Sequence, residues 1–128
     1  MHGMTIVQAN NQLLAAKRRR ITLENDAETL RQCRTQIRII KMTMESRTST
    51  FRQASRREQA DWCGESGTKY SEKRNQVTTN TSLYLNEIDR IVDLINQQIT
   101  NINNQITTVN GTIRNLRQFI ENERVRVM

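Results

Sequence analysis

Residues 85–120 read LNEIDRIVDLINQQITNINNQITTVNGTIRNLRQFI, and the spacing of the apolar residues in this stretch decides the fold. One row recurs every seven residues, and a second row follows it three residues on. The first row is Leu85, Val92, Ile99, Ile106, Ile113 and Ile120, and the second is Ile88, Ile95, Ile102, Val109 and Leu116. An apolar period of 3.5 residues excludes a β-strand and predicts a helix packed in a coiled-coil seam. Because the stretch is rich in Asn, Thr and β-branched residues, packing rather than intrinsic propensity has to hold this helix.

The first half of the chain shows a less regular stripe of the same period. Its seven-residue row is Ala16, Leu23, Leu30, Ile37, Met44 and Phe51. The companion row, three residues on, contains Cys33, Ile40 and Ala54 and is interrupted by Asp26 and Arg47. The apolar residues Val7, Leu14 and Ile21, which begin before Ala16, repeat on a different face. This change predicts a discontinuity of the coiled coil near the basic cluster at 17–20.

Between the two halves lies DWCGESG, residues 61–67, with the only tryptophan, Trp62, and two of the four glycines. The chain has no proline, so this stretch is the strongest break in the sequence. A short turn joins antiparallel neighbours. We therefore predict an all-α fold: a long antiparallel two-helix hairpin that forms a single domain over residues 1–128. The expected boundaries are a helix from about 5 to 60, a turn from about 61 to 68 and a helix from about 69 to 123.

Composition limits what such a chain can build. Only 35% of its 128 residues are hydrophobic and 4% are aromatic, which suits one thin apolar seam and makes stability depend on a second chain. Residues 1–64 hold 12 Lys and Arg against 6 Asp and Glu, whereas residues 65–128 hold 8 against 7. The basic first helix suits nucleic acid, anionic lipid or an acidic partner helix, or is a solvated face. Because Glu24, Asp26 and Glu28 interrupt the basic track, we do not expect nucleic acid to be the partner.

More apolar rows exist than one hairpin seam needs. Val77, Tyr84 and Ile91 are seven residues apart and flank the main seam of the second helix, and Val7 and Leu14 lie outside the main row of the first. These five residues are our candidate partner-binding surface. The alternative is that they only broaden the seam within the chain.

The sequence shows no catalytic or metal-binding constellation. It has one histidine, no glycine-rich phosphate loop and no pocket that two helices would enclose, so we expect no enzyme activity, no cofactor and no metal. No stretch predicts a transmembrane helix, and no apolar run follows a charged N-terminus. If the protein leaves the cell, we expect it to use a route other than the general secretory one.

Two motifs remain. Trp62-Cys63-Gly64 is a Trp-x-Gly at the break between the helices, where Gly64 suits a left-handed helix end. Phe119 and Glu123 are an aromatic residue and an acid four positions apart near the end of the second helix, so they share a helix face. Each motif also has a simpler interpretation. The Trp-x-Gly can merely cap the hairpin, and Phe119 and Glu123 can be a seam aromatic and a surface charge.

Together these features resemble the WXG superfamily of type VII secretion proteins, in architecture over the whole chain. The length, the basic first helix and the isoleucine-rich second helix are most similar to the small helical partner proteins of LXG toxins of Gram-positive bacteria. By this resemblance Trp62 and Gly64 match the turn motif, and Phe119 and Glu123 match the secretion signal, in a mixed form of that signal.

The resemblance implies a targeting or chaperone-like partner that binds the helical N-terminal domain of an LXG-type toxin, or another small helical protein. It would present the toxin to the ATPase of the secretion apparatus. The protein would be cytoplasmic before export and would leave the cell with its partner by the type VII route. The alternatives are a WXG-type homodimer that is itself the secreted substrate and a basic coiled coil that binds nucleic acid.

Overall fold

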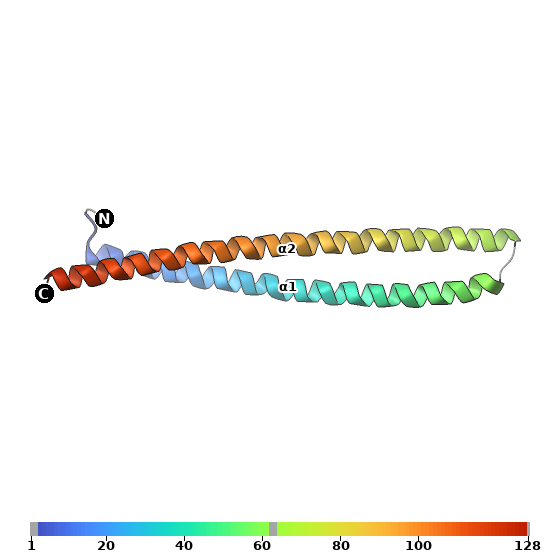
Figure 1. Cartoon of the computed structure of the whole chain (residues 1–128), viewed down its shortest axis with the longest axis horizontal. Helices are drawn as coiled ribbons and strands as arrows, with labels where there is room; N and C mark the ends of the chain where they lie inside the picture. The colour runs from blue at the N-terminus through green and yellow to red at the C-terminus, as the bar shows by residue number, and fades with distance from the viewer. Residues whose placement is uncertain (1–2, 62–63, 128) are drawn as a thin grey trace. The chain divides into compact units, whose positions relative to one another are not determined.

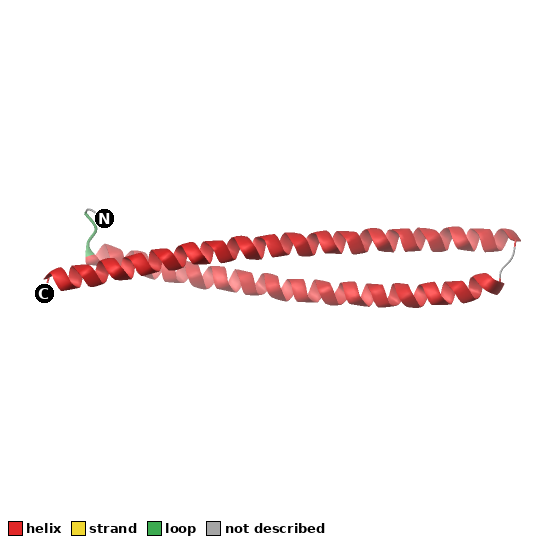
Figure 2. Ribbon diagram, in the orientation of Figure 1, coloured by secondary structure: helices red, strands yellow, loops and turns green. Residues whose placement is uncertain are grey.

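The computed structural model describes the backbone of residues 3–61 and 64–127 and the side chains of residues 3–54 and 68–127. It consists of two helices that pack against each other, α1 (Ile6–Asp61) and α2 (Gly64–Val127), with 56 and 64 residues (Figure 1). Apart from the segment that precedes α1, every described residue is helical (Figure 2). The chain is therefore an all-α helical hairpin, as the heptads predict.

The helices continue further than the sequence indicates. α1 ends at Asp61, close to the predicted limit, whereas α2 begins at Gly64 rather than at about Lys69. At the other end α2 extends to Val127, beyond the predicted limit at Glu123. The structure thus shortens the predicted turn, because an established helix propagates cheaply through weak helix formers when no proline stops it.

α1 begins with a reciprocal hydrogen-bonded cap. The Gln8 backbone N–H donates to Thr5 Oγ1 at 3.1 Å, and the Thr5 N–H donates to Gln8 Oε1 at 2.9 Å. This is a capping box, and Met4 packs near Ala9 as the apolar staple that accompanies it. Gly3, with φ of 80°, supplies the left-handed backbone that precedes the cap.

The chain divides into two compact units, which we treat separately. Unit 1 contains Met1–Arg31 and Asn96–Met128, and unit 2 contains Gln32–Ile95. In unit 1, Ala9 packs with Leu116 and Ile120, and Leu23 packs with Val109 and Ile113. Since the contacts on α2 move backwards as α1 advances, the two helical segments of unit 1 are antiparallel.

Unit 1 contains a closed apolar core. All eight buried hydrophobic residues among the described side chains belong to it, and they are Ala9, Leu23, Ala27, Ile99, Val109, Ile113, Leu116 and Ile120. Unit 2 has none among its described side chains, and its seam residues are at most half-buried. Burial therefore differs between the units although the heptad spacing does not.

The seam of α2 is the predicted one. All eleven residues of its two rows are buried or half-buried, which confirms the prediction from residues 85–120. We letter the heptad a to g, with Leu85 at position a and Ile88 at position d. The same alternation continues toward Gly64 with polar residues, which are Ser71, Arg74, Thr78 and Thr81.

The seam of α1 differs from the prediction in one of its rows. The seven-residue row from Ala16 to Phe51 is correct and occupies position d. The companion row is wrong: position a is Ile6, Leu13, Arg20, Ala27, Arg34, Lys41 and Thr48, which are all buried or half-buried. Cys33, Ile40 and Ala54 are exposed instead. The alternation is unbroken from Ile6 to Phe51, so the predicted discontinuity is also absent there.

Candidate protein-binding surfaces

Unit 2 carries an apolar strip on one side of its seam. Lys41 Nζ lies 2.5 Å from Asp89 Oδ1, which places position a of α1 beside position e of α2. The g positions of both helices therefore lie on the opposite side, where two antiparallel helices bring them together. We call five of these g residues the unit 2 strip; they are Cys33, Ile40, Val77, Tyr84 and Ile91, and Arg47 is a charged residue at position g of the same unit.

The strip is exposed. Tyr84 is 65% exposed, Ile40 is 55% and Ile91 is 36%, and Val77 and Cys33 are exposed as well. Isolated exposed apolar residues are normal on protein surfaces, but a row that continues across two helices is typical of a protein–protein contact. The three residues predicted on α2 thus lie on the surface, and α1 extends their row.

The two sides of unit 2 differ in charge. Positions a, b and e of its described residues carry eight charged groups, Arg34, Arg38, Lys41, Glu45, Arg52, Glu72, Asp89 and Asp93. The corresponding positions on the strip side, c, d and g, carry four, Arg47, Lys73, Arg74 and Glu87. The strip side can therefore be covered by another chain with little desolvation of charge.

Two ion pairs of unit 2 shift pKa values. The hydrogen bond that Lys41 Nζ donates to Asp89 raises the pKa of Lys41, and Glu45 Oε1, 3.7 Å from the same Nζ, adds to the shift. Arg90 Nε donates to Glu87 Oε1 at 3.0 Å, and this bond lowers the pKa of Glu87. Both pairs are solvated, so they orient side chains on the surface rather than forming a reactive centre.

In unit 1 the predicted contact residues are also exposed. Val7 is 68% exposed and Leu14 is 48%, and Ile21 continues the row at 55%. The three are seven residues apart at position b of α1, outside the seam. They belong to a different surface from the unit 2 strip, so the five predicted residues are divided between the units.

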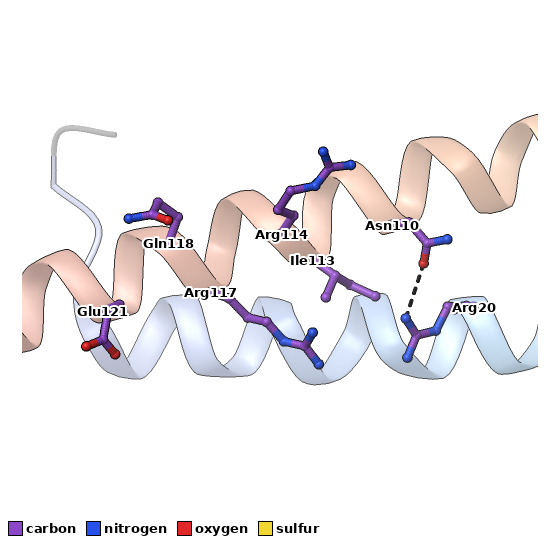
Figure 3. A pocket seen from close by; sticks show the side chains of 7 residues that line it. All are labelled: Arg20, Asn110, Ile113, Arg114, Arg117, Gln118 and Glu121. Carbon is purple, nitrogen blue, oxygen red and sulfur yellow. Dashed lines mark hydrogen bonds between the residues drawn. The ribbon is translucent and has the colours of Figure 1, made fainter.

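A basic hollow lies beside this row in unit 1. Its volume is about 580 Å³, and its lining is Arg20, Asn110, Ile113, Arg114, Arg117, Gln118 and Glu121. Arg20 extends from α1 and donates from Nη1 to Asn110 Oδ1 at 3.2 Å, while Arg117 extends from α2 in the direction of α1 (Figure 3). This hollow was not predicted from the sequence, although closely spaced cations such as Arg114 and Arg117 are a signal of anion binding.

The predicted secretion signal is engaged in contacts within unit 1. Phe119 is half-buried and packs against the core cluster of Ala9, Leu116 and Ile120. Glu123 Oε2 accepts a hydrogen bond from Arg126 Nη2 at 2.6 Å. Both side chains thus have contacts within unit 1, and the role of Phe119 and Glu123 as a secretion signal stays a prediction.

Of the predicted turn motif, Trp62 lies outside the described residues, and so does the side-chain environment at Gly64. The backbone of Gly64 is the first residue of α2. The motif therefore remains a feature of the sequence.

The described part of the chain holds no group of three or more His, Cys, Asp or Glu side chains placed to bind a metal ion. Within the same residues, neither helix has a segment both long and apolar enough to cross a membrane. No protein-family model, no curated protein and no solved structure matches the chain.

Proposed function

We propose that this protein is a WXG-type helical partner in type VII secretion, which binds the helical N-terminal domain of an LXG-type toxin and helps present it for export. The observation that carries the proposal is the unit 2 strip. It lies on the part of the hairpin whose described side chains include no buried hydrophobic residue.

Burial against a partner explains this strip better than the broadening of the internal seam. A seam flank that served only the hairpin would be covered by it, yet Tyr84 is 65% exposed and Ile40, in the same strip, is 55%. Burying large apolar side chains gains about 1.5–3 kcal/mol each. A few such residues, with a second helix pair laid over them, are enough to form a bundle core that unit 2 lacks by itself.

The proposed membership of the WXG superfamily and the proposed toxin partner rest on the Trp-x-Gly motif and on the two-helix architecture of the chain. What supports both is that α1 ends at Asp61 and α2 begins at Gly64, on either side of Trp62 in the sequence. In this role the strip holds the toxin's helices, while Phe119 and Glu123 near the end of α2 form the part presented to the secretion ATPase.

The test is capture of the toxin domain by the full chain, with export of the toxin as the second readout. Tyr84→Glu places a charge in the strip and should weaken the complex at least about a hundredfold, because a buried unpaired charge is costly. Met42→Glu is the matched control: Met42 is 68% exposed in the same unit, at position b on the charged side of the seam. It should leave capture and export unchanged.

Equal loss in the two variants would contradict the proposal, and so would capture that neither variant affects. The homodimer is the second candidate, because the low charge around the strip also suits a second copy of the same surface. If Tyr84→Glu converts a self-associated chain into a monomer and no toxin domain is captured, the homodimer is correct. Binding to random-sequence DNA that falls steeply with salt would favour the nucleic-acid alternative.

A further inference from the structure

The basic hollow of unit 1 is independent of the unit 2 strip. Three of its seven lining residues are arginines, and Glu121 is its one carboxylate. Arg20 has partners, since it donates to Asn110 and its Nε lies 3.9 Å from Glu24 Oε1. Among the described residues, Arg114 and Arg117 form no hydrogen bond or ion pair. These two guanidinium groups are one helical turn apart on α2; Arg117 extends toward α1 and Arg114 extends away from it, and both keep their donors available to a ligand (Figure 3).

A guanidinium group has five N–H donors in a planar fork that matches a carboxylate. Placing three of these groups around one hollow costs repulsion that a bound anion removes. The hollow is open and is lined by two helices, so it suits an extended occupant better than a single small ion. Arg117 already extends from α2 toward α1, where Arg20 lies (Figure 3).

The apolar row of unit 1 borders the same region of α1. Ile21 follows Arg20 in the sequence, and Leu14 lies one heptad before Ile21, at the same position b. Lys17 lies between them at position e and adds a further cation to this side of the helix. Unit 1 therefore offers an exposed apolar row next to a cationic hollow.

We infer that this surface binds an acidic amphipathic helix, whose carboxylates one turn apart bond Arg114 and Arg117 and whose apolar side covers Leu14 and Ile21. The inference rests on the proposed function for the origin of that helix, which belongs to the partner protein. A second copy of this chain does not fit, because it brings the same arginines and repels them.

The experiment measures binding of a labelled peptide to the full chain. The peptide has about four heptads, with Leu at a and d and Glu at e and g, so that its own charge keeps it monomeric. The matched peptide carries Gln in place of every Glu. The acidic peptide should bind and should lose affinity as salt rises, whereas the Gln peptide should not bind.

The variant Arg114→Gln/Arg117→Gln should lower the affinity for the acidic peptide about tenfold to a hundredfold, because it removes two charge-assisted hydrogen bonds. The control Arg38→Gln/Arg52→Gln removes the same charge from exposed arginines of unit 2 and should change affinity less than about twofold. Both arginine pairs are exposed, so neither variant removes a core contact. Leu14→Gln should weaken binding as well, while leaving the salt dependence in place.

Equal losses in the two arginine variants would overturn the inference, because they would show a diffuse positive field and no site. Binding of the Gln peptide with the same affinity would overturn it too, as would a single-stranded oligonucleotide that outcompetes the acidic peptide at the hollow. If Tyr84→Glu leaves toxin capture intact while the peptide result holds, the proposed function fails and the acidic-helix site stands. If the peptide result fails while Tyr84→Glu abolishes capture, only the site is lost.

Discussion

Unit 1 and unit 2 use the same two helices and the same heptad spacing, yet only unit 1 closes a core. In unit 1 the α2 seam is isoleucine, valine and leucine, and α1 meets it with small or branched residues such as Ala9, Ala27 and Leu23. In unit 2 polar residues enter both seams, including Lys41 and Thr81. Among the described side chains thirteen large hydrophobic residues are exposed, and eight of them belong to this unit. Spacing therefore pairs the helices, whereas the residue types at a and d decide whether the pair is self-sufficient.

The largest expected effect comes from truncating equivalent seam residues in the two units. Ile113 is 2% exposed, and Ile113→Ala should lower the free energy of unfolding by about 2–5 kcal/mol because it leaves a cavity. Ile88→Ala makes the same change in unit 2, where the side chain is half-buried, and should cost about 1 kcal/mol. Urea unfolding followed by circular dichroism gives both values. Equal costs would show that the difference in burial has no energetic counterpart.

An intermediate effect on stability is expected from replacing polar seam residues of unit 2 with apolar ones. Thr78→Ile with Thr81→Ile adds apolar groups at half-buried a and d positions and should raise the free energy of unfolding by about 1–2 kcal/mol. Amide hydrogen exchange should slow in unit 2 and stay unchanged in unit 1. Thr79→Ile is the matched control, because Thr79 is exposed at position b and should give no gain. A gain as large from Thr79→Ile would contradict a seam effect.

The smallest effect concerns pH. The pKa of Lys41 is raised above its ordinary 10.5 by Asp89, so the pair's contribution is complete below pH 10.5 and is lost as pH rises through the raised pKa. The pKa of Glu87 is lowered from 4.5 by Arg90, so that contribution is complete above pH 4.5 and is lost as pH falls through the lowered value. Both pairs belong to unit 2.

Thermal unfolding of the wild type and of Lys41→Gln, compared at pH 8 and pH 11, tests the first pair. The difference between the two proteins should be present at pH 8 and should shrink at the higher pH. A difference that grows with pH would have the wrong sign and would exclude the Lys41–Asp89 pair as its source.

The sequence predicted the hairpin and the whole α2 seam because eleven strongly apolar residues at one spacing leave a single solution. The α1 seam was only half predicted. Its position a holds Arg20, Arg34 and Lys41, because the long aliphatic stems of such side chains pack in a seam. The side chains of Arg20 and Lys41 stay about a third exposed, whereas the Nε atom of Arg34 is buried. Reading by hydrophobicity instead selected Cys33 and Ile40, which lie on the surface.

The surfaces followed the same pattern. The exposure of Val77, Tyr84 and Ile91 was predictable, because α2 already had a complete seam without them. The membership of Ile40 in their strip was not, because it depends on which side of α1 faces α2. The basic hollow requires Arg20 of α1 and Arg117 of α2 to come together across the hairpin, and only the fold brings residues so far apart in the chain into one site.

Two threonines at position c of α1 in unit 2 lower the polarity of the surface beside the strip. Thr43 and Thr50 each donate the hydroxyl hydrogen to the carbonyl oxygen four residues earlier. With its hydroxyl engaged by its own helix, such a threonine offers a neighbour a methyl group, much as valine would. The surface beside the strip is therefore more apolar than the mean hydropathy of −0.75 indicates. In handling, purified protein should adsorb and self-associate like a far more apolar chain, and mild non-ionic detergent should relieve this more effectively than added salt.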